Sequence, residues 1–161
     1  MRPTLLFVVL MFVAMVSPAW AQVSALAAID QELRAHFPKV TSIKAVELEK
    51  LMGSKLRPIV IDVWEPEEFA VSRLQGAVRI DPDAELDDVL RAIGPELEDR
   101  IIIVYCSVGV RSTELAERVG GGLKSRGVSQ IANLSKGIFG WHNATRTLMR
   151  GTQKTPYVDP L

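Results

Sequence analysis

Residues 101–112 read IIIVYCSVGVRS and combine an apolar run, a cysteine and a short glycine-containing loop. The apolar run Ile101–Tyr105 is typical of a strand that is buried on both faces of a parallel sheet. The only cysteine, Cys106, follows at once, and a short loop joins it to Arg111 and a predicted helix. Backbone N–H groups of such a loop and the positive end of the helix both favour negative charge on sulfur. The pattern therefore indicates a reactive thiol, and the alternative is a buried structural cysteine.

The loop after Cys106 is predicted to be a small cradle for an anion. Successive N–H groups turned inward form such a cradle, and Gly109 provides the backbone freedom that the turn needs. Arg111 adds a fixed positive charge with several donors. We expect Cys106 and Arg111 to be the catalytic residues. The predicted binding loop consists of Ser107, Val108, Gly109, Val110 and Ser112.

Outward from this stretch, short apolar runs alternate with helical patterns, which predicts an α/β domain with a mostly parallel sheet. Strands are expected at 40–43, 58–63, 76–80, 101–105 and 130–134, and helices at 23–37, 44–52, from 65, 83–93, 112–126 and 137–148. Sites in such sheets form at the carboxyl ends of strands, where both Asp62 and Cys106 fall. Asp62 is a candidate supporting residue; the alternative is a carboxylate that caps the local backbone.

The helix predicted after the loop contains three consecutive glycines, residues 120–122. Each glycine costs about 1 kcal/mol relative to alanine inside a helix. Either close packing against the sheet offsets this cost, or the helix breaks here. After the last helix, residues 149–161 are rich in turn formers and are predicted to be a tail on the surface.

The amino terminus has the features of an export signal. One basic residue, Arg2, precedes an apolar run from Thr4 to Val16, and the segment ends with Ala19-Trp20-Ala21. This pattern is typical of a secretory signal peptide over residues 1–21 that is cleaved after Ala21. An uncleaved membrane anchor is the alternative, although the apolar run is shorter than the roughly 20 residues of a spanning helix. We expect a periplasmic or secreted protein.

Composition narrows the function classes. Without residues 1–21, 140 residues remain, which is enough for one domain. Their 18 basic and 19 acidic side chains nearly balance, and no basic face for nucleic acid stands out. Exported domains that use cysteine for stability use it in pairs. A lone thiol is therefore inert, paired with another chain, or reactive.

Four segments together resemble the rhodanese family. Residues 101–113 contain its Cys-x-x-Gly-x-Arg-Ser loop. The upstream residues 61–69 and 74–78, and the downstream residues 134–141, resemble its other motifs in the same order. The resemblance implies a three-layer domain with a mostly parallel five-stranded sheet flanked by helices. We place this domain at residues 38–148, after a helical lead-in at 22–37.

The resemblance implies sulfur transfer without a metal or organic cofactor. Cys106 would take sulfur as a persulfide from a donor such as thiosulfate and pass it to a nucleophilic acceptor, either a small molecule or a thiol-bearing protein. Arg111 would orient the donor and support the loop. The alternatives are a non-catalytic protein-binding or sulfur-relay module, and a redox sensor that forms an intermolecular disulfide.

Two departures from the family pattern stand out. Trp64 replaces the arginine that usually follows Asp-Val, and Ser72-Arg73 replaces Gly-His. The usual arginine is expected to pair with the glutamate that Glu68 matches; Trp64 cannot form that pair, which leaves Arg73 as a candidate. Phosphatases of similar architecture use Cys-x5-Arg, whereas four residues separate Cys106 from Arg111 here, which favours sulfur over phosphate.

Overall fold

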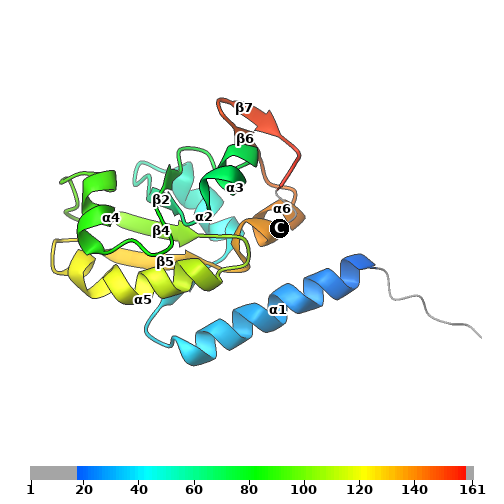
Figure 1. Ribbon diagram of the computed structural model, residues 1–161, viewed down its shortest axis with the longest axis horizontal. Coiled ribbons are helices and arrows are strands. Elements are labelled where there is room, and N and C mark those ends of the chain that lie inside the picture. The colour runs from blue at the N-terminus through cyan, green and yellow to red at the C-terminus, as the bar shows by residue number, and fades with distance from the viewer. Residues whose placement is uncertain (1–17, 159–161) are drawn as a thin grey trace, which may run out of the picture.

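A five-stranded parallel sheet forms the centre of the computed structural model, which describes residues 18–158 (Figure 1). The strand order is β1-β5-β4-β2-β3, and every neighbouring pair is parallel. The predicted α/β class and five-stranded sheet are confirmed. The strands are β1 (Thr41–Ile43), β2 (Ile59–Asp62), β3 (Val78–Arg79), β4 (Ile101–Tyr105) and β5 (Gln130–Leu134).

The central strand β4 is the most buried part of the sheet. It pairs with β2 on one side and with β5 on the other, and residues 102–105 have no exposed surface. Burial of such aliphatic side chains contributes about 1.5–3 kcal/mol each. The core therefore holds the end of β4, and with it Cys106, in a fixed place.

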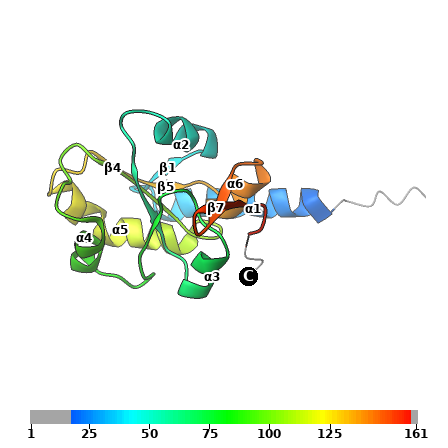
Figure 2. The same cartoon turned by 90° about the horizontal axis from the view of Figure 1, so that it is seen from above.

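Helices cover both faces of this sheet. Figure 2 shows α4 and α5 on one face and α2 on the other. The helices that follow the first strand are α2 (Ala45–Met52), α3 (Pro66–Val71), α4 (Leu86–Ile93), α5 (Val110–Lys124) and α6 (Gly137–Asn143). The sheet between two helical layers is the predicted three-layer arrangement.

The three glycines of α5 do not break this helix, which continues to Lys124. A Cβ at Gly122 would lie 2.3 Å from the Leu86 side chain of α4, so the missing side chain allows the two helices to approach closely. A Cβ at Gly120 would touch Ile131 of β5 at 3.4 Å, whereas one at Gly121 would meet nothing within 4 Å. The helix therefore does not break, and its closest packing is against α4 at Gly122 and not, as predicted, against the sheet.

The carboxyl-terminal region differs from the prediction. The last helix ends at Asn143 instead of residue 148, because Thr145 has a left-handed backbone with φ of 57°. The following chain forms an antiparallel hairpin of β6 (Leu148–Arg150) and β7 (Gln153–Thr155) where a surface tail was expected. The backbone of Met149 also bonds to that of Arg73, which joins the hairpin to the domain.

The first helix, α1 (Pro18–His36), starts five residues before the helix predicted at 23–37. Its buried residues Leu26 and Asp30 face the domain, and Arg34 pairs with Asp30. The predicted export signal lies outside the described residues except for positions 18–21, which are part of α1. Within residues 18–158, no helix combines the length and the apolar character that a membrane span requires.

Candidate active site

Cys106 lies where β4 ends and the loop to α5 begins, and its residue is only 1% exposed. Its Sγ accepts a hydrogen bond of 3.2 Å from the backbone N–H of Gly109. Gly109 has φ of 106°, a left-handed conformation that side chains disfavour, and this conformation turns its N–H back toward the sulfur. The bond directs a positive dipole at sulfur, as expected for a loop that stabilises an anion there.

The start of α6 holds the other side of this loop. The N–H groups of Ile138 and Phe139 donate to the carbonyls of Cys106 and Ser107 at 2.9 and 3.1 Å. A Cβ on Gly137 would lie 2.4 Å from both carbonyl oxygens, so only glycine permits this approach. The motif that contains Gly137 thus fixes the loop that contains Cys106.

Arg111 forms a two-pronged ion pair with Glu68 of α3. Its Nη1 and Nη2 lie 2.9 Å from the two carboxylate oxygens, and Nη2 also donates to Ser107 Oγ at 3.0 Å. Although burial raises the pKa of Glu68, the hydrogen bonds from Arg111 and from the Glu65 backbone outweigh it and lower that pKa. The bond to Glu68 in turn raises the pKa of Arg111. Arg111 therefore supports the loop, and Glu68 offsets its charge.

Arg73 is not the partner of Glu68. Its guanidinium lies over the Phe69 ring, 4.4 Å from the centroid, and donates to the carbonyls of Phe69 and Gly151. These contacts tie α3 to the turn of the β6–β7 hairpin, because Gly151 lies in that turn. Arg111 of the loop, and not Arg73, is the residue that pairs with Glu68.

Trp64 approaches the same loop from β2. Its fully buried indole donates from Nε1 to Ser107 Oγ at 2.7 Å. Its backbone N–H donates to Asp62 Oδ1 at 3.1 Å, and its carbonyl accepts from Arg79 at 3.2 Å. The residue that departs from the family pattern is therefore a direct partner of the loop.

Asp62 lies beside the loop and forms hydrogen bonds with Trp64 and Tyr105. Its carboxylate caps the Trp64 backbone, and its other oxygen accepts a hydrogen bond from the hydroxyl of Tyr105, which also accepts from the Leu74 N–H. Burial is the main cause that raises the pKa of Asp62 to about 7, against the opposing effect of the Tyr105 hydrogen bond. The bond from the Trp64 N–H is a local backbone cap of the kind that the alternative describes, and the supporting role of Asp62 stays a prediction.

The predicted binding loop divides into two parts. Helix α5 begins at Val110, two residues before the predicted start, so Ser112 lies in its first turn and donates to Asn133 Oδ1 of β5 at 2.7 Å. Ser112 therefore faces the sheet and holds the base of the loop. Val108 is partly exposed and Val110 is 37% exposed, which gives the loop an apolar outer edge.

Helix α1 contributes a contact that the sequence did not indicate. A Cβ on Gly109 would lie 3.4 Å from Leu33 of α1, and Arg34 donates to Ser135 Oγ at 3.5 Å. The lead-in helix thus packs against the loop of Cys106 and against the turn that follows β5. The contact joins segments about 75 residues apart, and no local pattern marks it.

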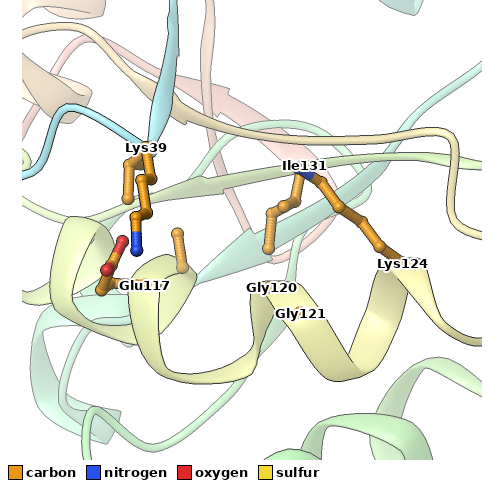
Figure 3. A pocket seen from close by; sticks show the side chains of 8 residues that line it. Lys39, Glu117, Gly120, Gly121, Lys124 and Ile131 are labelled. Atoms are coloured by element: carbon orange, nitrogen blue, oxygen red, sulfur yellow. The ribbon is translucent and has the colours of Figure 1, made fainter.

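A pocket lies away from the loop of Cys106. Figure 3 shows the residues that line it, from α5, from the chain before β1 and from β5. Its volume is about 300 Å³. Its lining includes Lys39, Glu117, Gly120, Lys124 and Ile131, none of which belongs to the loop of Cys106. In the part of the chain that the structure describes, no group of three His, Cys, Asp or Glu side chains is placed to hold a metal ion.

Comparison with known proteins assigns the family. Residues 44–144 match the rhodanese-like domain. The chain belongs to the rhodanese-like domain family. Its Cys-x4-Arg loop, the parallel sheet and the position of Cys106 after the central strand agree with the resemblance found in the sequence.

Two curated proteins are similar to part of this chain. A tRNA uridine(34) hydroxylase of Shouchella clausii is 35% identical over 82 residues, which cover 50% of this chain and 24% of that protein. The probable adenylyltransferase/sulfurtransferase MoeZ of Mycobacterium tuberculosis is 30% identical over 107 residues, which cover 66% of this chain and 26% of MoeZ. The rhodanese-like chain therefore spans about a quarter of the length of these curated relatives.

Solved structures share the fold. A thiosulfate sulfurtransferase of Pseudomonas aeruginosa aligns with a TM-score of 0.61 and 20% identity, over 78% of this chain and 23% of that one. A rhodanese-like domain protein of Staphylococcus aureus aligns with a TM-score of 0.50 and 25% identity, over 63% of this chain and 91% of that one. The first likeness, at its low identity, supports the rhodanese-like fold alone.

Proposed function

We propose that this protein is a sulfurtransferase that carries sulfane sulfur as a persulfide on Cys106. The observation that carries the proposal is the hydrogen bond from the Gly109 N–H to Cys106 Sγ, within a Cys-x4-Arg loop at the carboxyl end of the central strand. A thiolate is the nucleophilic form of cysteine, and a donor aimed at sulfur favours that form and an anionic persulfide alike.

The proposed reaction has two steps. The Cys106 thiolate attacks the outer sulfur of thiosulfate; the new S–S bond forms as the old one breaks, and sulfite leaves with the electron pair. A nucleophile such as cyanide then attacks the outer sulfur of the persulfide, leaves as thiocyanate, and returns the thiolate. Neither step needs an oxidant or a reductant, which suits a chain whose only cysteine is Cys106.

Phosphate-ester hydrolysis has less support. Four residues separate Cys106 from Arg111, and the Arg111 guanidinium is bound by Glu68 on both of its terminal nitrogens. An oxyanion of a phosphate ester would have to compete with that carboxylate. The short loop suits a single sulfur atom better.

A protein acceptor is the second candidate, as a sulfur relay or a binding module. Cys106 is almost fully buried, while Val110 at the edge of its loop is 37% exposed. An apolar rim around a recessed thiol favours contact with another protein over attraction of free anions.

We also propose export through residues 1–21, which would put the partner in the periplasm or outside the cell.

Turnover with small molecules tests the proposal. The chain without residues 1–21 is mixed with thiosulfate and cyanide, thiocyanate is measured, and Cys106→Ser serves as the control. We expect thiocyanate from the native chain and none from the variant. Equal rates for both would contradict the proposal. Sulfur uptake without discharge to cyanide would favour the relay, and a covalent dimer would favour a redox sensor.

A further inference from the structure

The hydroxyl of Ser107 is held by two donors that have no accepting capacity. Trp64 Nε1 lies 2.7 Å from Ser107 Oγ, and Arg111 Nη2 lies 3.0 Å from it. An indole N–H and a guanidinium N–H can only donate, so Ser107 Oγ accepts both hydrogen bonds. Ser107 itself is 3% exposed, which leaves little room for water to replace either donor.

These two bonds determine what the Ser107 hydroxyl can still do. A serine hydroxyl has two lone pairs and one hydrogen. Both lone pairs are used, and within residues 18–158 no hydrogen bond takes up the remaining hydrogen. Among the residues that the structure describes, the hydroxyl is therefore left as a donor without an acceptor, and a buried unpaired donor is costly.

We propose that Ser107 is a dedicated hydrogen-bond donor to the negative charge on the sulfur that Cys106 carries, with Trp64 as its positioning residue. The inference rests on the proposed function. Ser107 follows Cys106 directly in the loop, and the Gly109 N–H already donates to the same sulfur. No proton is transferred: the hydroxyl donates to the outer sulfur as charge builds there, while sulfite leaves with its electron pair.

Trp64 is suited to this positioning role because burial and hydrogen bonds restrain it. Its side chain is fully buried, and Asp62 and Arg79 bind its backbone on both sides. Arg111 is similarly held by Glu68. The Ser107 hydroxyl thus lies between two restrained donors, Trp64 and Arg111. Its orientation is already set before sulfur binds, so binding costs little further loss of rotational freedom.

A double-mutant cycle tests the inference. Single-turnover loading by thiosulfate is followed as the gain of one sulfur atom, in Ser107→Ala, in Trp64→Phe and in the double variant. We expect each single variant to load about tenfold more slowly, the size expected for one hydrogen bond to a charged group. The double variant should be no slower than Ser107→Ala, because Trp64 acts through Ser107.

Trp141→Phe is the matched control. It removes the same kind of indole donor, which bonds to the Thr147 carbonyl at 3.0 Å and not to the loop, and it should load at the native rate. If the fold-losses in loading rate of the two single variants multiply in the double variant, the positioning role of Trp64 is overturned. Ser107→Ala with native loading would overturn the whole inference.

Two further outcomes separate this inference from the proposed function. If the native protein takes up no sulfur, both are overturned together; if it loads and Ser107→Ala loads equally well, only this inference is. Should Trp64→Phe fail to fold, Ser107→Thr decides: it keeps the hydroxyl and should load faster than Ser107→Ala. Equal loss in both serine variants would overturn the donor role.

Discussion

Arg111 and Glu68 lie 43 residues apart in the sequence and form a two-pronged ion pair with both N–O distances at 2.9 Å. The pair joins the first turn of α5 to α3, and both side chains are mostly buried. The positive charge beside the Cys106 loop is therefore balanced before any substrate arrives. Attraction of a free anion depends on this balance.

Glu68→Gln should expose that charge. The variant leaves Arg111 without its carboxylate, so we expect the KM for thiosulfate to fall about fivefold at low salt and the salt dependence of KM to become steeper. Stability should fall by about 1–3 kcal/mol, because a mostly buried cation loses its partner. Steady-state kinetics at two salt concentrations and urea denaturation measure both effects. Arg111→Gln removes the positive charge instead and should raise the KM for thiosulfate. A change of KM in the same direction in both variants would contradict the account.

Asp62 should make stability fall as pH rises from about 4 to 7. The folded protein holds the Asp62 proton up to a pKa of about 7, whereas the unfolded chain loses it near 3.8. Between these values the folded state binds more protons, so this group contributes most below pH 4, and its contribution is lost by about pH 7. The slope contributed is up to about −1.4 kcal/mol per pH unit. Urea denaturation at pH 5, 6, 7 and 8 should show a weaker slope for Asp62→Asn; parallel curves would contradict this.

Gly137→Ala should damage the loop that holds Cys106. The new Cβ would lie 2.4 Å from the carbonyl oxygens of Cys106 and Ser107, and its backbone has φ of 56°. Backbone atoms cannot move aside as a flexible side chain can, so we expect a loss of at least about 3 kcal/mol in the free energy of unfolding. Gly151→Ala, with φ of 58° and open space around its Cβ, is the matched control for backbone strain alone. An equal loss in both would mean that the contact with the loop costs nothing.

The neighbouring glycines of α5 should respond differently to alanine. Gly121→Ala adds a methyl group to open space inside a helix and should stabilise the protein by about 0.5–1 kcal/mol. Gly122→Ala must displace Leu86 of α4 and should leave the protein less stable than Gly121→Ala. Thermal unfolding of both variants measures the difference, and the reverse order would show that α4 does not pack closely on Gly122.

The sequence predicted the parts of the fold that depend on local pattern. The strands at 101–105 and 130–134 have the predicted bounds, because continuous apolar runs between turns leave little choice. The end of α6 was missed because a threonine in the left-handed region, Thr145, stops the helix, and neither glycine nor proline marks the position. The loop of Cys106 was found from its family motif. The hydrogen bond from Ser112 to the sheet was not predicted, because it depends on where α5 begins.

The partners of the loop were beyond prediction because they come from distant segments. Glu68, Trp64 and Leu33 reach the loop from α3, from the end of β2 and from α1. The sequence marked Trp64 only as a departure from the family pattern. Its hydrogen bond to Ser107 follows from the register of β2 and β4, which places Asp62 beside Tyr105.

The most direct test of the account is the intact mass of the protein after thiosulfate treatment and removal of excess reagent. We predict a gain of one sulfur atom that maps to Cys106, is absent from Cys106→Ser and disappears when cyanide is added. An unchanged mass across small sulfane donors, or a sulfur that remains in Cys106→Ser, would contradict the claim that Cys106 is the sulfur carrier.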